Sequence, residues 1–292
     1  YQNLLTGKIP IQLPNDLPGT IPDVDNGIND GFDNVTVNLT DSSGFEFENV
    51  SMVSTVGFTD PTRTMIKLTN LNVGNNLLTG TLDSRIGLMT GLTGLYLSDN
   101  FLVGSLPTEI GNLISLIDVR VNGNQFTGPL PTELGSLGQL PLRFWFYKNR
   151  FNGTIPSELG ELSRLQDLRM GDNVITGTIP DQIFNMSRLQ FLDVTGMGLT
   201  GTLSTLVGQL TELQALQVST NQLTGTIPLE LQNLSSLRVA SFQYNLFTGQ
   251  IPTELCSLVP GVLKVLEADC EDPLDDPPNP CLCCTRCFDR DQ

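Results

Sequence analysis

Aromatic, arginine and aspartate residues recur every 24 or 25 residues in the middle of the chain, at Tyr96, Arg120, Trp145, Arg169 and Asp193. Aromatic rings and guanidinium groups dominate binding hot spots, because they combine a large rigid contact area with forked hydrogen bonding. The chain holds 15 basic against 31 acidic residues, so basic side chains gathered around its single tryptophan indicate a local site. The chemistry that this set predicts is recognition of an anionic or carbohydrate ligand.

Neighbouring positions extend this candidate site. Arg143 and Tyr147 flank the tryptophan at two residues on either side, and Phe191 precedes Asp193 by the same spacing. Side chains two residues apart on a strand point to the same face, and Trp145 is predicted to stand exposed between two arginines of adjacent strands. The alternative is a solvated face in which the arginines and the tryptophan satisfy one another as a cation–π stack. The predicted ligand-binding residues are Tyr96, Arg120, Arg143, Trp145, Tyr147, Arg169, Phe191 and Asp193.

Residue types that most catalytic sites need are missing from the sequence. The chain has no histidine, which removes the usual general base and every Ser-His or Cys-His arrangement. It has no phosphate-binding glycine loop and no histidine-based metal site. We therefore expect no enzyme activity, no cofactor and no metal. The net charge of −16 argues against nucleic acid as a partner, and no apolar run of 18 residues is present that could insert into a membrane.

A repeat sets the spacing of the candidate residues. A segment of the form Asn-x-Leu-Thr-Gly-x-Ile-Pro recurs eight times between residues 71 and 252, in steps of 24, 24, 25, 24, 24, 24 and 24 residues. In the copy 165–180, Leu168 and Met170 alternate with Asp167 and Arg169, which predicts a short strand with one buried face. No copy buries enough apolar surface alone, so neighbours must stack around a shared core. The asparagine position is occupied by Asn76, Asn100, Asn124, Asn149, Asn173, Met197, Asn221 and Asn245.

A second pattern follows the asparagine segment. A proline is followed two residues later by a glutamate in several copies, as in Pro107 with Glu109 and Pro156 with Glu158. Proline at the first position and an acidic residue at the third fit the start of a short helix or 3₁₀ turn, where the acidic group complements the helix dipole. We expect this column of glutamates to be structural.

Self-similarity at this period, with a leucine-rich strand and an asparagine, is the signature of leucine-rich repeats. The segments NQLTGTIPLELQNLSSL and NRFNGTIPSELGELSRL resemble the plant-type extracellular repeats of receptor-kinase ectodomains and polygalacturonase-inhibiting proteins, and the resemblance covers roughly residues 67–255. It implies an α/β repeat solenoid: a leucine-rich-repeat superhelix with a parallel concave sheet, short convex 3₁₀ or helical turns and a second short sheet around the Thr-Gly segment. It also implies ligand recognition outside the cell.

Three parts are predicted along the chain. Residues 1–66 are expected to form an irregular, mostly β N-terminal cap or an island between repeats, residues 67–255 the eight repeats of about 24 residues, and residues 256–292 a cysteine-rich C-terminal cap with an acidic, Pro-rich stretch. The stretch 23–33 resembles a calcium loop, but its spacing fails the EF-hand pattern, so we interpret it as a polar turn. Plant-type caps usually carry a cysteine pair at the N-terminal side, and this chain has none before Cys256.

All six cysteines lie in the C-terminal segment. An even number behind a repeat array favours a disulfide-stapled cap that hides the open end of the core, with the pairing left open by the sequence. The alternative is a thiolate cluster for zinc or copper, because four of the cysteines are closely spaced. The predicted disulfide-bonded residues are Cys256, Cys270, Cys281, Cys283, Cys284 and Cys287.

Six Asn-x-Ser/Thr triplets mark candidate N-glycosylation sites, a meaning that they have in a secreted protein. Together with the extracellular repeat type, they predict a location outside the cell or at the cell surface. The predicted glycosylation sites are Asn34, Asn38, Asn49, Asn152, Asn185 and Asn233.

These observations predict an extracellular recognition module that binds a protein, peptide or polysaccharide on its concave face. An alternative is a structural component of an extracellular coat or filament, assembled with other extracellular proteins. A minor alternative is ice binding through Thr-x-Thr pairs such as Thr176 and Thr178, which resemble the threonine arrays of β-solenoid antifreeze proteins. Val103, Pro129 and Asn152 interrupt those threonine columns.

Overall fold

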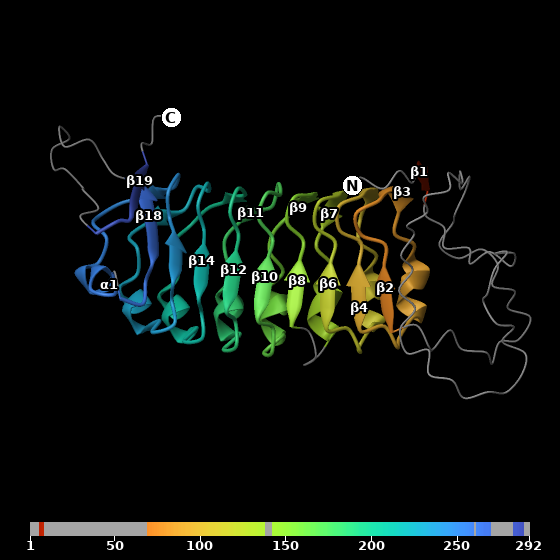
Figure 1. Cartoon of the computed structure of the whole chain (residues 1–292), viewed down its shortest axis with the longest axis horizontal. Coiled ribbons are helices and arrows are strands. Elements are labelled where there is room, and N and C mark those ends of the chain that lie inside the picture. The colour runs from red at the N-terminus through yellow and green to blue at the C-terminus, as the bar shows by residue number, and fades with distance from the viewer. Residues whose placement is uncertain (1–5, 9–68, 138–141, 260, 270–282, 289–292) are drawn as a thin grey trace, which may run out of the picture.

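The structure is a computed structural model that describes residues 6–8, 69–137, 142–259, 261–269 and 283–288. Within these residues the repeats stack side by side along one long axis (Figure 1). This arrangement confirms the predicted leucine-rich-repeat solenoid. The predicted N-terminal cap, with the stretch 23–33 and the sequons at Asn34, Asn38 and Asn49, lies outside the described residues.

One short strand per repeat builds a ten-stranded parallel sheet, which we call the concave sheet after the resemblance above (Figure 1). In the strands β2 to β16 the middle residue points into the core, as Val119, Phe144 and Leu168 do, so the residues on either side of it face outward. Its strands are β2 (Asn70–Asn72), β4 (Gly94–Tyr96), β6 (Asp118–Arg120), β8 (Arg143–Trp145), β10 (Asp167–Arg169), β12 (Phe191–Asp193), β14 (Ala215–Gln217), β16 (Val239–Ser241), β18 (Val265–Asp269) and β19 (Arg286–Phe288).

A second set of strands follows the asparagine of each repeat, around the Thr-Gly segment, as expected. The glycine of this segment adopts a positive φ in copy after copy, for example 82° at Gly177, a conformation that glycine adopts at little cost. Five of these strands form one parallel sheet and four form two pairs. They are β1 (Thr6–Lys8), β3 (Leu77–Thr81), β5 (Phe101–Gly104), β7 (Gln125–Pro129) and β9 (Arg150–Asn152), then β11 (Thr176–Gly177) with β13 (Gly198–Leu199), and β15 (Thr224–Gly225) with β17 (Leu246–Phe247).

The first strand occupies the place of a preceding repeat. Gly7 of β1 lies beside Leu78 of β3, just as Gly80 of β3 lies beside Leu102 of β5. The second pair is 22 residues apart in the chain and the first pair is 71 apart. Two coils that are neighbours in space are therefore separated here by a much longer stretch of chain than a regular repeat.

Short turns close each repeat on the side opposite to the concave sheet. Pro107 and Pro156 lie one position earlier than predicted: each is the N-cap, with extended backbone, and the helical residues begin after it. The reason is that the N-cap conformation already has the φ near −65° that proline imposes. The turns are η1 (Ser84–Leu88), η2 (Thr108–Asn112), η3 (Thr132–Leu137), η4 (Ser157–Glu161), η5 (Asp181–Asn185), η6 (Thr205–Gln209), η7 (Leu229–Asn233) and the α-helix α1 (Thr253–Cys256).

Buried asparagines tie consecutive coils together. The Asn173 amide nitrogen donates to the carbonyls of Met170 (2.7 Å) and Phe146 (3.1 Å), and its oxygen accepts the Phe151 N–H at 3.0 Å. Six other asparagines of the repeat donate to backbone carbonyls in the same way. The predicted role of these side chains, satisfying backbone groups that the turn leaves unpaired, is confirmed. We call this column the asparagine ladder.

Met197 interrupts the asparagine ladder. It is 8 % exposed and lies where an asparagine would present its oxygen to the N–H of Ile175. In the preceding coil, the equivalent N–H is that of Phe151, which Asn173 accepts. The thioether is at best a weak acceptor. The core therefore keeps its apolar filling at this coil and loses the hydrogen bonds that the asparagine amide accepts and donates in the other coils.

Disulfides fasten the C-terminal end of the array. Cys256, the last residue of α1, is bonded to Cys283, 27 residues further along the chain, and Cys284 and Cys287 are disulfide-bonded as well. This finding supports the predicted disulfide cap over the thiolate metal cluster. Cys270 and Cys281 lie outside the described residues.

Candidate functional site

The predicted site residues come together in one column on the concave sheet. The Arg120 guanidinium lies 4.3 Å from the centre of the Trp145 ring and 5.2 Å from that of Tyr96. The Arg169 guanidinium lies 5.0 Å from the Trp145 ring and 5.4 Å from the Phe191 ring. Aromatic rings and guanidinium groups thus alternate across five neighbouring strands, β4 to β12. We call these five residues the aromatic–arginine ladder.

Strand register explains the ladder. Tyr96 pairs with Arg120, Arg120 with Trp145, and Trp145 with Arg169, each on adjacent parallel strands. Equivalent positions of parallel strands lie about 4.8 Å apart, which is the stacking distance of a planar group over a ring. Phe191 joins from the first position of β12, where it pairs with Asp167 and reaches Arg169 diagonally.

Two buried aspartates hold the arginines of the ladder. Arg120 donates to both carboxylate oxygens of Asp118, at 2.9 and 2.7 Å, and Arg169 does the same to Asp167, at 2.7 and 3.0 Å. The hydrogen bonds to Asp118 raise the pKa of the Arg120 guanidinium above its usual value. Bidentate pairs of this kind fix the plane of the guanidinium. Both ladder arginines are therefore neutralised and oriented by the protein itself.

Trp145 is less accessible than the sequence suggested. The prediction placed it exposed between two arginines, whereas it is half-buried, because Arg120 and Arg169 cover its ring from both sides. Its indole N–H is buried and has no hydrogen-bond acceptor in the described part of the chain. Trp145 is the centre of the ladder, and a ligand would meet its rim and the guanidinium planes instead of an open ring face.

Arg143 and Tyr147 border the ladder. The Arg143 side chain is 50 % exposed and contacts Asp118 only at 3.3 Å, so this arginine remains the accessible cation of the site. The Tyr147 ring centre lies 6.2 Å from that of Trp145 at a tilted angle. Partial burial raises the pKa values of Tyr96 and Tyr147 above the usual tyrosine value, so both rings stay neutral at physiological pH.

Asp193 marks the C-terminal side of the site without joining the stack. Its carboxylate accepts the Thr195 N–H at 3.0 Å. Burial raises the pKa of this carboxyl above its usual value, against the opposing effect of that hydrogen bond. Of the predicted ligand-binding residues, the structure therefore places Tyr96, Arg120, Trp145, Arg169 and Phe191 in one ladder, and Arg143, Tyr147 and Asp193 around it.

The aspartates that hold the ladder were not among the predicted site residues, although a local signal marks them. Asp118 and Arg120, and again Asp167 and Arg169, are separated by one residue on a strand, so each pair shares a face. The pattern Asp-x-Arg on both sides of the tryptophan strand was therefore sufficient to find them.

The three sequons in the described residues lie away from the concave sheet. Asn152 is the last residue of β9, and Asn185 and Asn233 end the 3₁₀ turns η5 and η7. All three are exposed. Glycans at these positions would leave the aromatic–arginine ladder uncovered.

The threonine columns lie on the second set of strands. Thr176, Thr200, Thr224 and Thr248 are exposed in successive coils, and each hydroxyl donates to a glycine carbonyl of the preceding coil at 3.1 to 3.3 Å. In the preceding coil Asn152 occupies the equivalent position, so the column of threonines ends there. These contacts give the hydroxyls a scaffold role, and ice binding stays a minor prediction.

The described residues include neither a candidate metal site nor a candidate membrane-spanning helix. They contain no group of three or more Cys, Asp or Glu side chains placed to hold a metal ion. Among the same residues, no helix has the length and apolar character to cross a membrane.

Comparisons with known proteins agree with the fold. The Leucine Rich Repeat family model matches residues 91–113 and 212–234. The chain is similar to the Arabidopsis receptor kinase HAESA, solved with the peptide hormone IDA and the co-receptor SERK1, at 30% identity and a TM-score of 0.65, over 70% of this chain and 34% of that one. It is similar to the ectodomain of GASSHO1/SCHENGEN3 from Arabidopsis thaliana, solved with CASPARIAN STRIP INTEGRITY FACTOR 2, at 29% identity and a TM-score of 0.62, over 69% of this chain and 26% of that one.

The chain spans about a third of the length of these receptor structures or less. A plant ice-binding protein matches at 22% identity and a TM-score of 0.50, over 64% of this chain and 67% of that one, which shows the fold alone. A comparison with curated proteins finds no match. The fold, the repeats and the family model define the protein as a leucine-rich-repeat solenoid. Its repeats are of the kind that builds the ectodomains of plant membrane receptor kinases.

Proposed function

We propose that this solenoid is an extracellular recognition module that binds a peptide, protein or polysaccharide on its concave sheet, without catalysing a reaction. The observation that carries the proposal is the aromatic–arginine ladder, which gathers five rigid planar side chains across adjacent strands. Planar aromatic and guanidinium groups in a preorganised array lose little entropy when a ligand binds.

Two further observations support it. Solved structures similar to this chain include receptor ectodomains in complex with a peptide hormone. The sequons at Asn152, Asn185 and Asn233 lie off the concave sheet, which fits a surface kept free for a partner.

The paired aspartates refine the class of ligand. Because Asp118 and Asp167 neutralise Arg120 and Arg169, the ladder offers flat surfaces more than free positive charge. Such a surface suits the apolar face of a sugar ring or an aromatic or proline side chain of a peptide. An isolated anionic group is disfavoured, because it would have to compete with two buried carboxylates already in place.

Tryptophan fluorescence provides the test, since Trp145 is the single tryptophan of the chain. We would titrate the protein with neutral and acidic polysaccharides and with fractionated extracellular peptides. A saturable emission change is expected for a neutral ligand, with little dependence on salt. In a tryptophan-independent assay, Arg120→Ala should weaken binding at least about tenfold, which corresponds to roughly 1.4 kcal/mol. Arg238→Ala, which removes an exposed arginine outside the ladder, is the matched control.

A charge experiment separates stacking from simple electrostatics. Asp118→Asn combined with Asp167→Asn frees two guanidiniums, so it should create salt-sensitive binding to an acidic polysaccharide that the wild type binds weakly. Asp172→Asn with Asp181→Asn changes the net charge equally at exposed positions and should not. If both double variants behave alike, or if Arg120→Ala leaves every interaction intact while the protein self-associates, the ladder is not the binding site and the coat or filament alternative gains support.

A further inference from the structure

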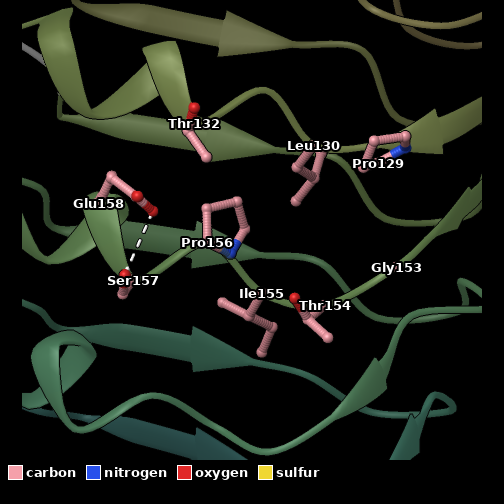
Figure 2. A pocket seen from close by; sticks show the side chains of 9 residues that line it. All are labelled: Pro129, Leu130, Thr132, Gly153, Thr154, Ile155, Pro156, Ser157 and Glu158. Carbon is pink, nitrogen blue, oxygen red and sulfur yellow. Dashed lines mark hydrogen bonds between the residues drawn. The ribbon is translucent and has the colours of Figure 1, made fainter.

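A shallow groove lies on the opposite side of the repeat from the ladder, between two consecutive coils (Figure 2). Its volume is about 400 Å³, and its floor and walls come from Pro129, Leu130, Ile155 and Pro156. Figure 2 shows Pro129 and Gly153 at one end, with Thr132, Ser157 and Glu158 at the other. The groove is thus apolar along its length and carries hydroxyl and carboxylate groups at its far end.

Pro129 leaves the glycine at one end of the groove without the methyl group that covers it in most coils. In five other repeats a threonine occupies the same position and its methyl group covers the glycine of the next coil, and in the preceding coil the position is Ser105. The Thr154 methyl, for example, is 2.9 Å from where a Cβ on Gly177 would lie. At Gly153 the nearest atom to that point is the Pro129 Cβ, at 3.3 Å. The proline ring is bound back to its own backbone and leaves the space above the next coil open.

A sequon lies at the Pro129 end of this groove. Asn152, Gly153 and Thr154 form an Asn-x-Thr triplet, and the second and third of these residues line the groove. Asn152 is exposed and pairs with Pro129 across the β7–β9 ladder, so its side chain begins at the Pro129 end. The other described sequons, Asn185 and Asn233, end 3₁₀ turns and contribute no residue to the groove.

We propose that Asn152 carries an N-linked glycan whose first sugar residues lie in this groove. The apolar face of a sugar ring would pack against Pro129, the exposed proline of the lining, in the way that ligands with flat apolar faces occupy apolar clefts. The sugar hydroxyls would meet Thr132 and Glu158 at the far end, where the Glu158 carboxylate accepts one hydrogen bond from Ser157 at 3.3 Å and retains further acceptor sites. The seated glycan bridges two coils and holds them together.

This inference rests on the extracellular location in the proposed function, because glycan transfer requires the secretory pathway. The test uses the whole chain secreted from a eukaryotic host. Glycopeptide mass spectrometry reads the occupancy of Asn152, Asn185 and Asn233 separately. Hydrogen exchange of residues 129–132 and 153–158 then reports whether the sugar lies in the groove, and trimming the glycan to its first sugar shows whether that residue is sufficient.

Three variants sharpen the outcome. Asn152→Gln should speed hydrogen exchange in the groove segments by about tenfold, an effect of local opening. Asn185→Gln removes a sequon that contributes no residue to the groove, so it should leave hydrogen exchange in the groove segments unchanged. Pro129→Thr keeps the Asn152 sequon and restores the threonine of other coils, so it should abolish the glycan-dependent protection. The same variants produced without glycosylation control for effects of the substitutions on the polypeptide alone.

The results distinguish this inference from the proposed function. Occupancy at Asn185 and Asn233 with an unmodified Asn152 overturns the inference and leaves the extracellular module intact. An occupied Asn152 whose removal changes exchange no more than Asn185→Gln also overturns it, since the sugar then projects into solvent. Absence of glycan at all three sites overturns the inference together with the extracellular premise. Protection confined to the groove and lost in Pro129→Thr supports it.

Discussion

At the scale of single residues, contacts within the protein fix the orientation of the candidate binding side chains. Arg120 and Arg169 stack on Trp145 while each holds a carboxylate through two hydrogen bonds. Free guanidiniums on long side chains would lose rotamer entropy on meeting a ligand. Here the protein has already ordered them on folding, so the ladder is rigid before a partner arrives.

Asp193 provides a pH prediction at the same scale. Burial raises the pKa of its carboxyl, so the folded state binds this proton more tightly than the unfolded state. The ionised carboxylate therefore lowers the free energy of unfolding at neutral pH. This destabilisation disappears as the pH falls below the ordinary carboxyl pKa of 3.8. Asp193→Asn keeps an acceptor for the Thr195 N–H and carries no charge. We expect it to raise the melting temperature at pH 7 and to match the wild type near pH 3.

Thermal unfolding of the two proteins across that pH range measures the difference. Glu212→Gln, which removes an exposed carboxyl group that is not among the charges acting on Asp193, is the matched control. A constant gap between wild type and Asp193→Asn at every pH would contradict the prediction, because it would assign the effect to packing instead of protonation.

At the scale of elements, the sequence predicts the features that recur in every repeat. It predicts few of the features that depend on contacts between two coils. The period locates Leu168 in the core and Arg169 facing outward, and the Thr-Gly segment predicts the second strands. The burial of Trp145 depends on arginines from two neighbouring strands, each set by its own aspartate, so no single copy of the repeat contains it. The groove beside Pro129 is likewise lined by residues of two consecutive coils, so no single copy of the repeat contains it.

The asparagine ladder yields a prediction about elements that share it. Met197→Asn would return an acceptor to the buried Ile175 N–H, as Asn221 accepts the Leu199 N–H at 3.1 Å one coil later. A net hydrogen bond contributes about 1 kcal/mol, which corresponds to roughly 2–4 °C in melting temperature for a chain of this size. The reverse substitution, Asn221→Met, should lower the melting temperature by at least as much. Calorimetry of both variants checks the pair, and a destabilised Met197→Asn would show that the coil is packed around the thioether.

At the scale of the whole molecule, a solenoid is stable because each coil contacts only its neighbours, so its ends decide how it unfolds. The C-terminal end is fastened by the Cys256–Cys283 disulfide, which closes a loop of 27 residues that includes β18. Closing a loop of that length stabilises the folded chain by roughly 3 kcal/mol. The concave sheet continues past this loop into β19, so the disulfide joins the last coils to the rest of the array.

Replacing both cysteines, as Cys256→Ser with Cys283→Ser, should therefore loosen the array from this end. We expect hydrogen exchange to accelerate most in α1 and β18, less in β14, and not at all in β4 and β6, because coupling between coils passes only through nearest neighbours. Ligand binding at the aromatic–arginine ladder, whose central strand β8 lies five strands away from β18, should be retained at temperatures below the onset of melting. Exchange that rises equally in every strand would mean that the array unfolds as one unit, and the cap would then control the stability of the ladder as well as that of its own end.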